Sequence, residues 1–484
     1  MSTALHQRSP GKRSAPGKTG LAILHILRQP PGALRLPGLL PAINQSGDIR
    51  CGFFLPLPAP RGTRHGLILV STDGERRADT RRVNTSTTSL PLFNAPHRLL
   101  FFIGVCNLGL AMGWWALWLA GLQLGTPLPA PGLPPAWLHG LWMQYLVLPS
   151  FIFGFLLTVF PRWMGLPALP RWQYAGVGGG LFGAQIALLA ASLGWQPGMR
   201  LALLLALLGW AFGLVALGRL LLQEKGRTWH AWSCWSGLLM GWIGLLCFAI
   251  AAAGGDVRWQ ALSVSIGTFG LLLPIYTSVA HRMFPFFAGN VVPGYQAWRP
   301  PQWLATLWAL CLLHLLGEAL LLPLVMLLAD AGLLLLSLYS LWRWWPRGPK
   351  PPLLSVLFYG LAWWPLAMLL YLLQDIAALA GHPGWLERAP LHALAIGLFG
   401  SLLVAMVTRV TQGHSGRALV MPVVAWIALL GLQLVALLRI LAPLLSDPWR
   451  WHAVAAAGWL LVLAPWLLRL GWIYWRPRAD GKPD

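Results

Sequence analysis

Histidines and arginines within one apolar stretch are the residues of this chain best suited to chemistry. The stretch 392–417 reads HALAIGLFGSLLVAMVTRVTQGHSGR, with His392 and His414 near its ends and two arginines, Arg409 and Arg417. A polar group at membrane depth costs free energy and therefore needs a partner or a function. Neutral imidazole ligates haem iron or copper, and guanidinium groups bind anions such as haem propionates through paired hydrogen bonds.

Two residues elsewhere extend this set. His139 opens another apolar stretch, and Arg282 follows a third. His139 and His392, coming from different helices, could supply two bonds to one metal ion or haem iron. The alternative is that each histidine lies at the membrane interface among lipid headgroups and that the arginines are ordinary anchors on the cytoplasmic side.

A second group of polar residues also lies in apolar sequence. His314 and Glu318 are four residues apart and share a helix face, and Asp330 stands alone farther along. Inside a membrane such a pair could handle protons or bind a metal. If the chain turns at Gly317, Glu318 is instead solvated.

The chain lacks the sequence motifs of several other kinds of active or binding site. The chain has no HExxH, no GxxxxGK[ST], no CxxCH and no Rossmann glycine pattern, and it has no His-His dipeptide of the kind that a haem-copper oxidase core needs. Hydrolysis, nucleotide binding and c-type haem are therefore not indicated, and neither is any known class of enzyme.

Composition predicts the class of protein that positions these residues. Hydrophobic residues make up 57% of the chain and charged residues 10%, which is typical of a polytopic membrane protein. The net charge is +22, but 13 of the 35 Lys and Arg precede residue 98 and most others lie in short loops. Orientation in the bilayer explains these charges without a nucleic-acid partner.

The sequence predicts an all-α transmembrane bundle with lipid as its surroundings. Residues 1–95 are basic and are expected to be largely disordered, unless an overlong start was assigned to the chain; residues 96–475 form the membrane domain, and 476–484 a short cytoplasmic tail. Twelve helices are predicted near 99–121, 139–160, 173–194, 201–222, 231–253, 259–280, 303–319, 323–342, 353–374, 390–411, 418–441 and 452–474.

The charges of the loops predict the orientation of this bundle. Basic residues gather in alternate loops and in both terminal segments, whereas Asp256, Asp375, Glu387 and Asp447 fall in or near the opposite loops. Both termini are therefore expected in the cytoplasm. The split of 303–342 into two helices supports this assignment, because a single helix there would invert every later loop.

Three blocks of sequence resemble the signature of the NnrS family. The block 392–417 resembles its HALxxGxxG...MxxR...GHTGR pattern. Residues 154–159, GFLLTV, with the following loop 162–165, RWMG, resemble its GFLLTA and W-x-G loop, and residues 278–287, SVAHRMFPFF, are similar to its SVxGGRxxPFF. The blocks occur in the family's order, on the predicted second, sixth and tenth helices.

The resemblance implies a function. It implies a twelve-helix bacterial inner-membrane protein that contains b-type haem and copper and is linked to nitric oxide response, denitrification and nitrosative stress. His139 and His392 are then the candidate haem or metal ligands. Arg282, Arg409, His414 and Arg417 are the candidate residues that orient haem propionates or fix the cytoplasmic loops.

The chain also departs from the family pattern. The family's W-H-x-H-E-M opening of the second helix has lost its second histidine and its glutamate, replaced by Leu141 and Trp142, and Phe358 stands where a histidine is expected in the ninth helix. Fewer ligands imply altered haem binding, loss of copper, or loss of both.

Two other functions stay open on the sequence. One is a cofactor-free transporter in which Arg409, His314 and Glu318 line a pathway. The other is a non-catalytic membrane partner of a respiratory complex. The sequence does not distinguish substrates, redox partners or oligomeric states.

Overall fold

Long helices packed side by side form the part of the chain that the structure describes. The computed structural model describes residues 90–126, 128–129 and 132–482. Most of the segment that we expected to be disordered, residues 1–89, lies outside this part. A 3₁₀ helix, η1 (Pro91–Phe93), precedes the first long helix and is held in place by Tyr174, whose hydroxyl donates to the carbonyl of Phe93 at 2.7 Å.

Twelve long helices occur in the described residues, which confirms the predicted number. Several of them combine more than one segment. In chain order they are α1 (Pro96–Leu124); α2 (Pro135–Leu141), η2 (Trp142–Val147) and α3 (Leu148–Met164); α4 (Arg171–Ser192); α5 (Pro197–Gln223); α6 (Trp229–Ala252); α7 (Arg258–Ser265), η3 (Ile266–Leu272) and α8 (Leu273–Val291); α9 (Pro301–Ala319); α10 (Pro323–Trp344); α11 (Pro352–Leu361) and α12 (Trp363–Leu379); α13 (Ala389–His392), η4 (Ala393–Gly400) and α14 (Ser401–His414); α15 (Val423–Leu441), followed by the 3₁₀ turn η5 (Ala442–Leu444); and α16 (Pro448–Trp475).

Eleven of these helices are long and apolar enough to cross a membrane. The remaining helix, α9, is the seventh in chain order. It carries His314 and Glu318 and is not among these eleven. Arg98, near the start of α1, donates to the carbonyls of Tyr474 and Arg476 at the end of α16, at 3.3 and 2.7 Å. The start of α1 and the end of α16 therefore lie close together, as they do in a bundle with an even number of antiparallel helices.

Two helix boundaries can be compared with the predicted ones. The chain does turn after Ala319, with Leu321 at a φ of 54°, and α10 begins at Pro323, so the prediction of two helices is confirmed. The predicted end of the sixth helix near residue 280 was wrong, because the helix continues to Val291 with Pro285 inside it. A membrane helix tolerates proline, since neighbouring groups satisfy the freed backbone carbonyl.

Three of the helices contain a π-helical segment, and we call them the π-containing helices. They are Pro135–Met164 with η2, Arg258–Val291 with η3 and Ala389–His414 with η4. They are the second, sixth and tenth, so the same irregularity recurs at every fourth helix, a repeat that the sequence did not reveal. Single π-helical turns often occur at functional sites, because they rotate the side chains that follow.

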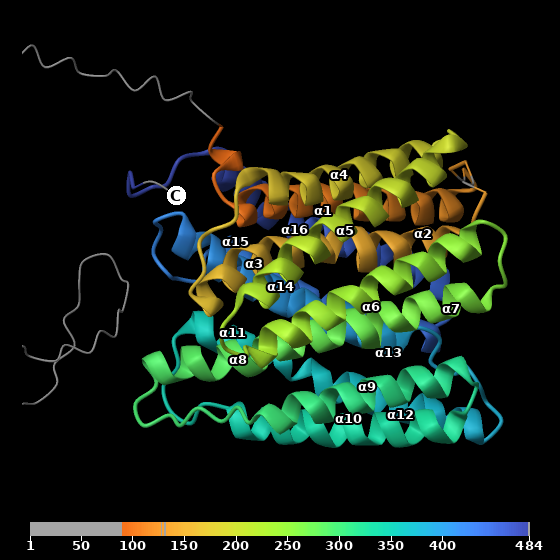
Figure 1. The fold of residues 1–484 in the computed structure, drawn as a ribbon. Helices are drawn as coiled ribbons and strands as arrows, with labels where there is room; N and C mark the ends of the chain where they lie inside the picture. The colour runs from red at the N-terminus through yellow and green to blue at the C-terminus, as the bar shows by residue number, and fades with distance from the viewer. Residues whose placement is uncertain (1–89, 127, 130–131, 483–484) are drawn as a thin grey trace, which may run out of the picture. The chain divides into compact units, whose positions relative to one another are not determined.

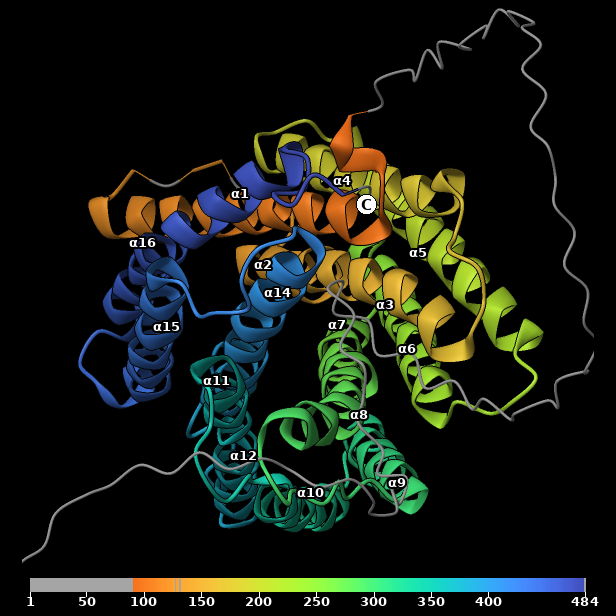
Figure 2. The same ribbon diagram turned by 90° about the vertical axis from the view of Figure 1, so that its left-hand side faces the viewer.

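The π-containing helices occupy the middle of the domain. Figure 2 shows α3, α8 and α14 facing one another with other helices outside them, and Figure 1 shows α2, α7 and α13 together at the opposite end of the same three helices. We call these two ends the Arg409 end (α3, α8, α14) and the His139 end (α2, α7, α13). The first and last helices, α1 and α16, pack against each other.

Three arginines link the π-containing helices in a cycle at the Arg409 end. Arg162 lies 3.3 Å from Nε2 of His414, the guanidinium of Arg282 lies 4.5 Å from the ring centre of Trp163, and that of Arg409 lies 3.9 Å from the ring centre of Phe287. The second helix thus contacts the tenth, the sixth contacts the second, and the tenth contacts the sixth. We call these three contacts the arginine cycle.

The arginine cycle predicts a measurable coupling energy. A partly desolvated cation–π pair contributes about 1–2 kcal/mol, so Arg282→Met and Trp163→Leu should each lower the melting temperature of the purified protein in detergent. In a double-mutant cycle the two changes should be non-additive by roughly 1 kcal/mol. Arg219→Met, at an exposed position on α5, is the matched control. Fully additive effects of the Arg282 and Trp163 changes would contradict the contact.

Candidate functional site

The His139 end brings together the two histidines predicted as ligands. His139 is near the end of α2 and His392 is the last residue of α13, and the two imidazoles are close enough to interact electrostatically. Both side chains are half-buried. The second and tenth helices therefore present one nitrogen-bearing ring each to the same region.

The hydrogen bonds of these rings suit metal ligation. Nδ1 of His392 lies 2.8 Å from the carbonyl of Arg388 and donates to it, which leaves Nε2 with its lone pair. Nδ1 of His139 is buried and has no hydrogen-bond partner among the described residues. Its ring stacks on Trp115, with 4.6 Å between ring centres and 12° between planes, and this contact fixes its orientation. Imidazoles with an available ring nitrogen are ligands that a haem iron accepts.

Two residues that the sequence analysis missed lie beside this pair. His392 is within electrostatic range of both Arg439, on α15, and His452, on α16. Nη1 of Arg439 and Nε2 of His452 are buried and have no hydrogen-bond partner among the described residues. Arg439 is thus a half-buried cation whose Nη1 could bind an anion such as a propionate, with Glu387 also within electrostatic range. Its position inside an apolar stretch was a signal that could have identified it.

Apolar side chains occupy the positions where the family pattern has further ligands. Leu141 is buried, and Trp142 packs against Trp114 with 4.6 Å between ring centres. Phe358 lies elsewhere, against Phe284 and Trp345. Within the described ranges no three His, Cys, Asp or Glu side chains gather in a group that could hold a metal ion. These residues do not fit a copper site.

Arg409 and Arg282 lie far from the histidine pair. Arg409 is 17 residues beyond His392 on the same helix, which at 1.5 Å per residue is about 25 Å. Both arginines belong to the arginine cycle. A group ligated by His139 and His392 therefore has Arg439 as its neighbouring cation, and not the arginines expected from the sequence.

His414 and Arg417 lie where the C-terminal segment meets the domain. Arg478 donates to the carbonyl of His414 at 3.1 Å, and the amide of Ala479 donates to the carbonyl of Ser415 at 2.9 Å. Arg417 is also within 3.5 Å of the carbonyl of Ser415. The GHSGR block thus holds the tail.

Gly416 is required at this junction for two reasons. Its φ is 70°, and a Cβ there would come within 2.5 Å of the Asp480 side chain. The Arg478 guanidinium donates to both carboxylate oxygens of Asp480, at 2.9 and 2.7 Å, and lowers the pKa of that exposed carboxyl well below its usual range. The tail therefore keeps its charge pair at any pH near neutrality.

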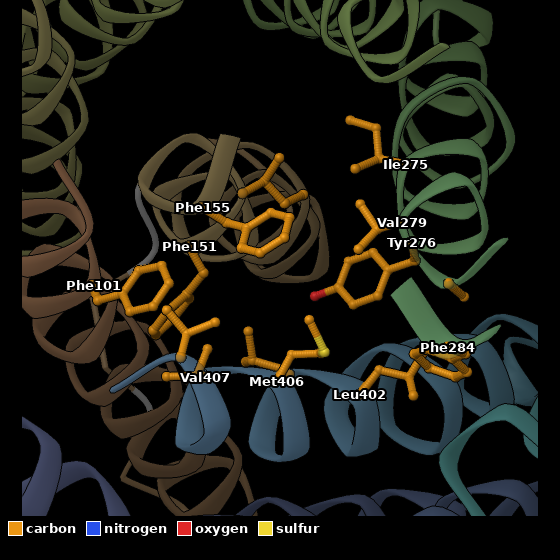
Figure 3. A pocket seen from close by; sticks show the side chains of 14 residues that line it. Phe101, Phe151, Phe155, Ile275, Tyr276, Val279, Phe284, Leu402, Met406 and Val407 are labelled. Carbon is orange, nitrogen blue, oxygen red and sulfur yellow. The ribbon is translucent and has the colours of Figure 1, made fainter. Parts of the chain in front are cut away.

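A cavity of about 70 Å³ lies between the π-containing helices and α1. Its walls are almost entirely apolar and include Phe101, Phe155, Val279 and Met406. Figure 3 shows the hydroxyl of Tyr276 directed into this space. Walls of this kind favour small apolar molecules.

The polar residues noticed in the seventh and eighth helices also meet. Nδ1 of His314 lies 2.7 Å from Oδ1 of Asp330, and its Nε2 lies 3.8 Å from Oε2 of Glu318. Glu318 accepts a hydrogen bond from the hydroxyl of Ser265 at 2.5 Å and is partly exposed. The sequence predicted the His314–Glu318 pair, whereas the partnership with Asp330 depends on the packing of α9 against α10.

Comparison with known proteins agrees with the three sequence blocks. A family model described as NnrS protein matches residues 91–478, which is most of the chain and all twelve helices. A search of curated proteins found no match. The three blocks of the signature lie on the three π-containing helices, and they meet in the arginine cycle. The chain belongs to the NnrS family of multi-pass membrane proteins.

Proposed function

We propose that this protein holds one b-type haem between His139 and His392 and helps the cell tolerate nitric oxide. The observation that carries the proposal is the proximity of two half-buried imidazoles from the second and tenth helices. Nδ1 of His392 donates to a carbonyl and leaves its Nε2 lone pair available, and Nδ1 of His139 is buried with no hydrogen-bond partner among the described residues. When bound, haem supplies a redox-active iron, and the protein sets its access and potential.

The surroundings of the histidine pair support this assignment. Arg439 offers a half-buried guanidinium for a propionate, and His452 offers a further imidazole at the same end. Trp115 holds the ring of His139 in one orientation. Because the residues do not fit copper, the proposal includes haem alone.

The apolar cavity supports a role with a small uncharged molecule. Nitric oxide is a diatomic gas without net charge, and it partitions into apolar spaces that exclude ions and water. The cavity lies between the same three helices that carry the candidate ligands and the arginine cycle. We propose that it stores or conducts nitric oxide within the membrane.

The transporter alternative receives less support. Arg409 lies on α14, at one end of the domain. His314 and Glu318 lie in the C-terminal part of α9, which is at the opposite end (Figure 1). The three residues expected to line one pathway are therefore separated.

Removing either histidine should remove the haem. We expect the purified protein from haem-supplied cells to show a Soret band, and His139→Ala and His392→Ala each to lose most of it, because an iron with one imidazole binds more weakly. His382→Ala is the matched control, since His382 lies in an exposed loop at the same end. The proposal fails if the wild type has no Soret band, or if both variants keep the wild-type spectrum.

Filling the cavity should abolish tolerance of nitric oxide. Val279→Trp places a large side chain in the cavity, so cells that depend on this variant should grow as poorly under a nitric oxide donor as cells without the protein. Val423→Trp, on an exposed helix position, should leave growth unchanged. Membrane abundance of both variants is measured in parallel, and normal tolerance by well-expressed Val279→Trp would contradict the role of the cavity.

We also propose that the Arg409 end faces the cytoplasm in a bacterial inner membrane. Basic residues concentrate in the loops at that end, where the positive-inside rule places them. A green fluorescent protein fused after residue 484 should therefore fluoresce, and alkaline phosphatase inserted at Gly381 should be active. An inactive phosphatase together with a dark fusion would reverse the orientation.

A further inference from the structure

A cluster of ionisable side chains lies within the helices, apart from the histidine pair and the cavity. It consists of His314 and Glu318 on α9, Asp330 on α10, and Tyr371 and Asp375 on α12. His314 is 1% exposed, Asp330 0% and Asp375 6%, so the three lie almost entirely out of contact with solvent. Buried charges of this kind need partners or protons.

The two aspartates face each other. The carboxyl group of Asp375 is within hydrogen-bonding range of that of Asp330, and Oδ2 of each has no donor among the described residues. Two ionised carboxylates in contact repel each other, and a hydrogen bond between them requires a proton. A shared proton supplies the partner that both oxygens lack.

The charged groups around Asp330 and Asp375 do not neutralise both carboxylates. The groups facing it are His314, Glu318 and Cys311 from α9 and Tyr371 from α12, with Arg388 within electrostatic range of Tyr371. His314 can balance one carboxylate when it is protonated. Three carboxyl groups against one imidazole still leave an excess of negative charge, which a proton on one of the carboxyl groups reduces.

The imidazole of His314 connects this pair to the outside. Its Nδ1 is 2.7 Å from Asp330, its Nε2 is 3.8 Å from Glu318, and the side chain of Glu318 is 28% exposed. Phe269 stacks on the ring, with 3.6 Å between ring centres, and restricts its movement. An imidazole held in this way can accept a proton at one nitrogen and release one from the other.

We propose that Asp330 and Asp375 form a proton-binding site inside the membrane domain, which exchanges its proton through His314 and Glu318. On loading, the carboxyl group of Glu318 moves from 3.8 Å to hydrogen-bond distance of Nε2 of His314 and gives it a proton, and the proton on Nδ1 passes to Oδ1 of Asp330. The imidazole ends neutral in its other tautomer, the carboxyl pair gains one proton, and Glu318 takes a proton from the surface. No electron moves, and the site needs no haem.

Infrared spectroscopy of the full-length protein in detergent tests the site. Difference spectra between acidic and alkaline pH should contain the carbonyl stretch of a protonated carboxylic acid that shifts in heavy water. We expect Asp330→Asn and Asp375→Asn each to lose this band and Asp256→Asn, at an exposed loop position, to keep it. A wild type without the band, or an equal band in both cluster variants, would overturn the proposal.

A second variant tests the route and does not depend on the folding of the aspartate variants. Glu318→Gln changes a partly exposed side chain, so the protein should keep its fold, and the band should remain but shift several-fold more slowly after transfer to heavy water. An exchange rate equal to that of the wild type would refute the relay through Glu318. Protein purified without haem should behave in the same way, so this outcome is independent of the proposed haem site.

Discussion

A charged side chain inside the membrane domain needs a partner within the protein. This requirement accounts for much of the structure. At the Arg409 end that need is met by the arginine cycle, in which Arg162, Arg282 and Arg409 each reach the next π-containing helix and bind an imidazole or an aromatic ring. Because every contact joins a different pair of helices, the second, sixth and tenth helices are fixed relative to one another. The apolar cavity lies between the helices that the cycle holds.

The same constraint has a different outcome at the His139 end. There one nitrogen each of His139, His452 and Arg439 is buried and has no hydrogen-bond partner in the described part of the chain, although Trp115 stacks on the ring of His139. Orphaned donors and acceptors cost free energy, and a protein retains them where a ligand completes the site. In the cluster of His314, Asp330 and Asp375 we propose a third outcome, in which a proton serves as the missing partner. Contacts between helices, the proposed cofactor site and the proposed proton site thus lie in different parts of the domain.

Much of the fold could be predicted from the sequence, and less of the site. Apolar runs of about twenty residues identified all twelve helices, because the thickness of the bilayer sets their length. The sixth helix was misjudged, since His281 and Arg282 looked like a boundary and the partners that bury them were not visible. The three π-helical segments were not predicted either, because a one-residue insertion in a helix leaves hydropathy unchanged.

By itself the sequence determined the class of protein, the family and the two imidazoles that suit haem, since hydropathy and residue type are local properties of the chain. Tertiary structure decided which polar groups meet. It placed Arg439 and His452 near His392, paired Arg282 with Trp163 and Arg409 with Phe287 at the far end, and joined Asp330 to His314 across two helices. Those contacts depend on how the helices are rotated and packed. Rotation and packing are determined jointly by side chains that lie far apart in the sequence.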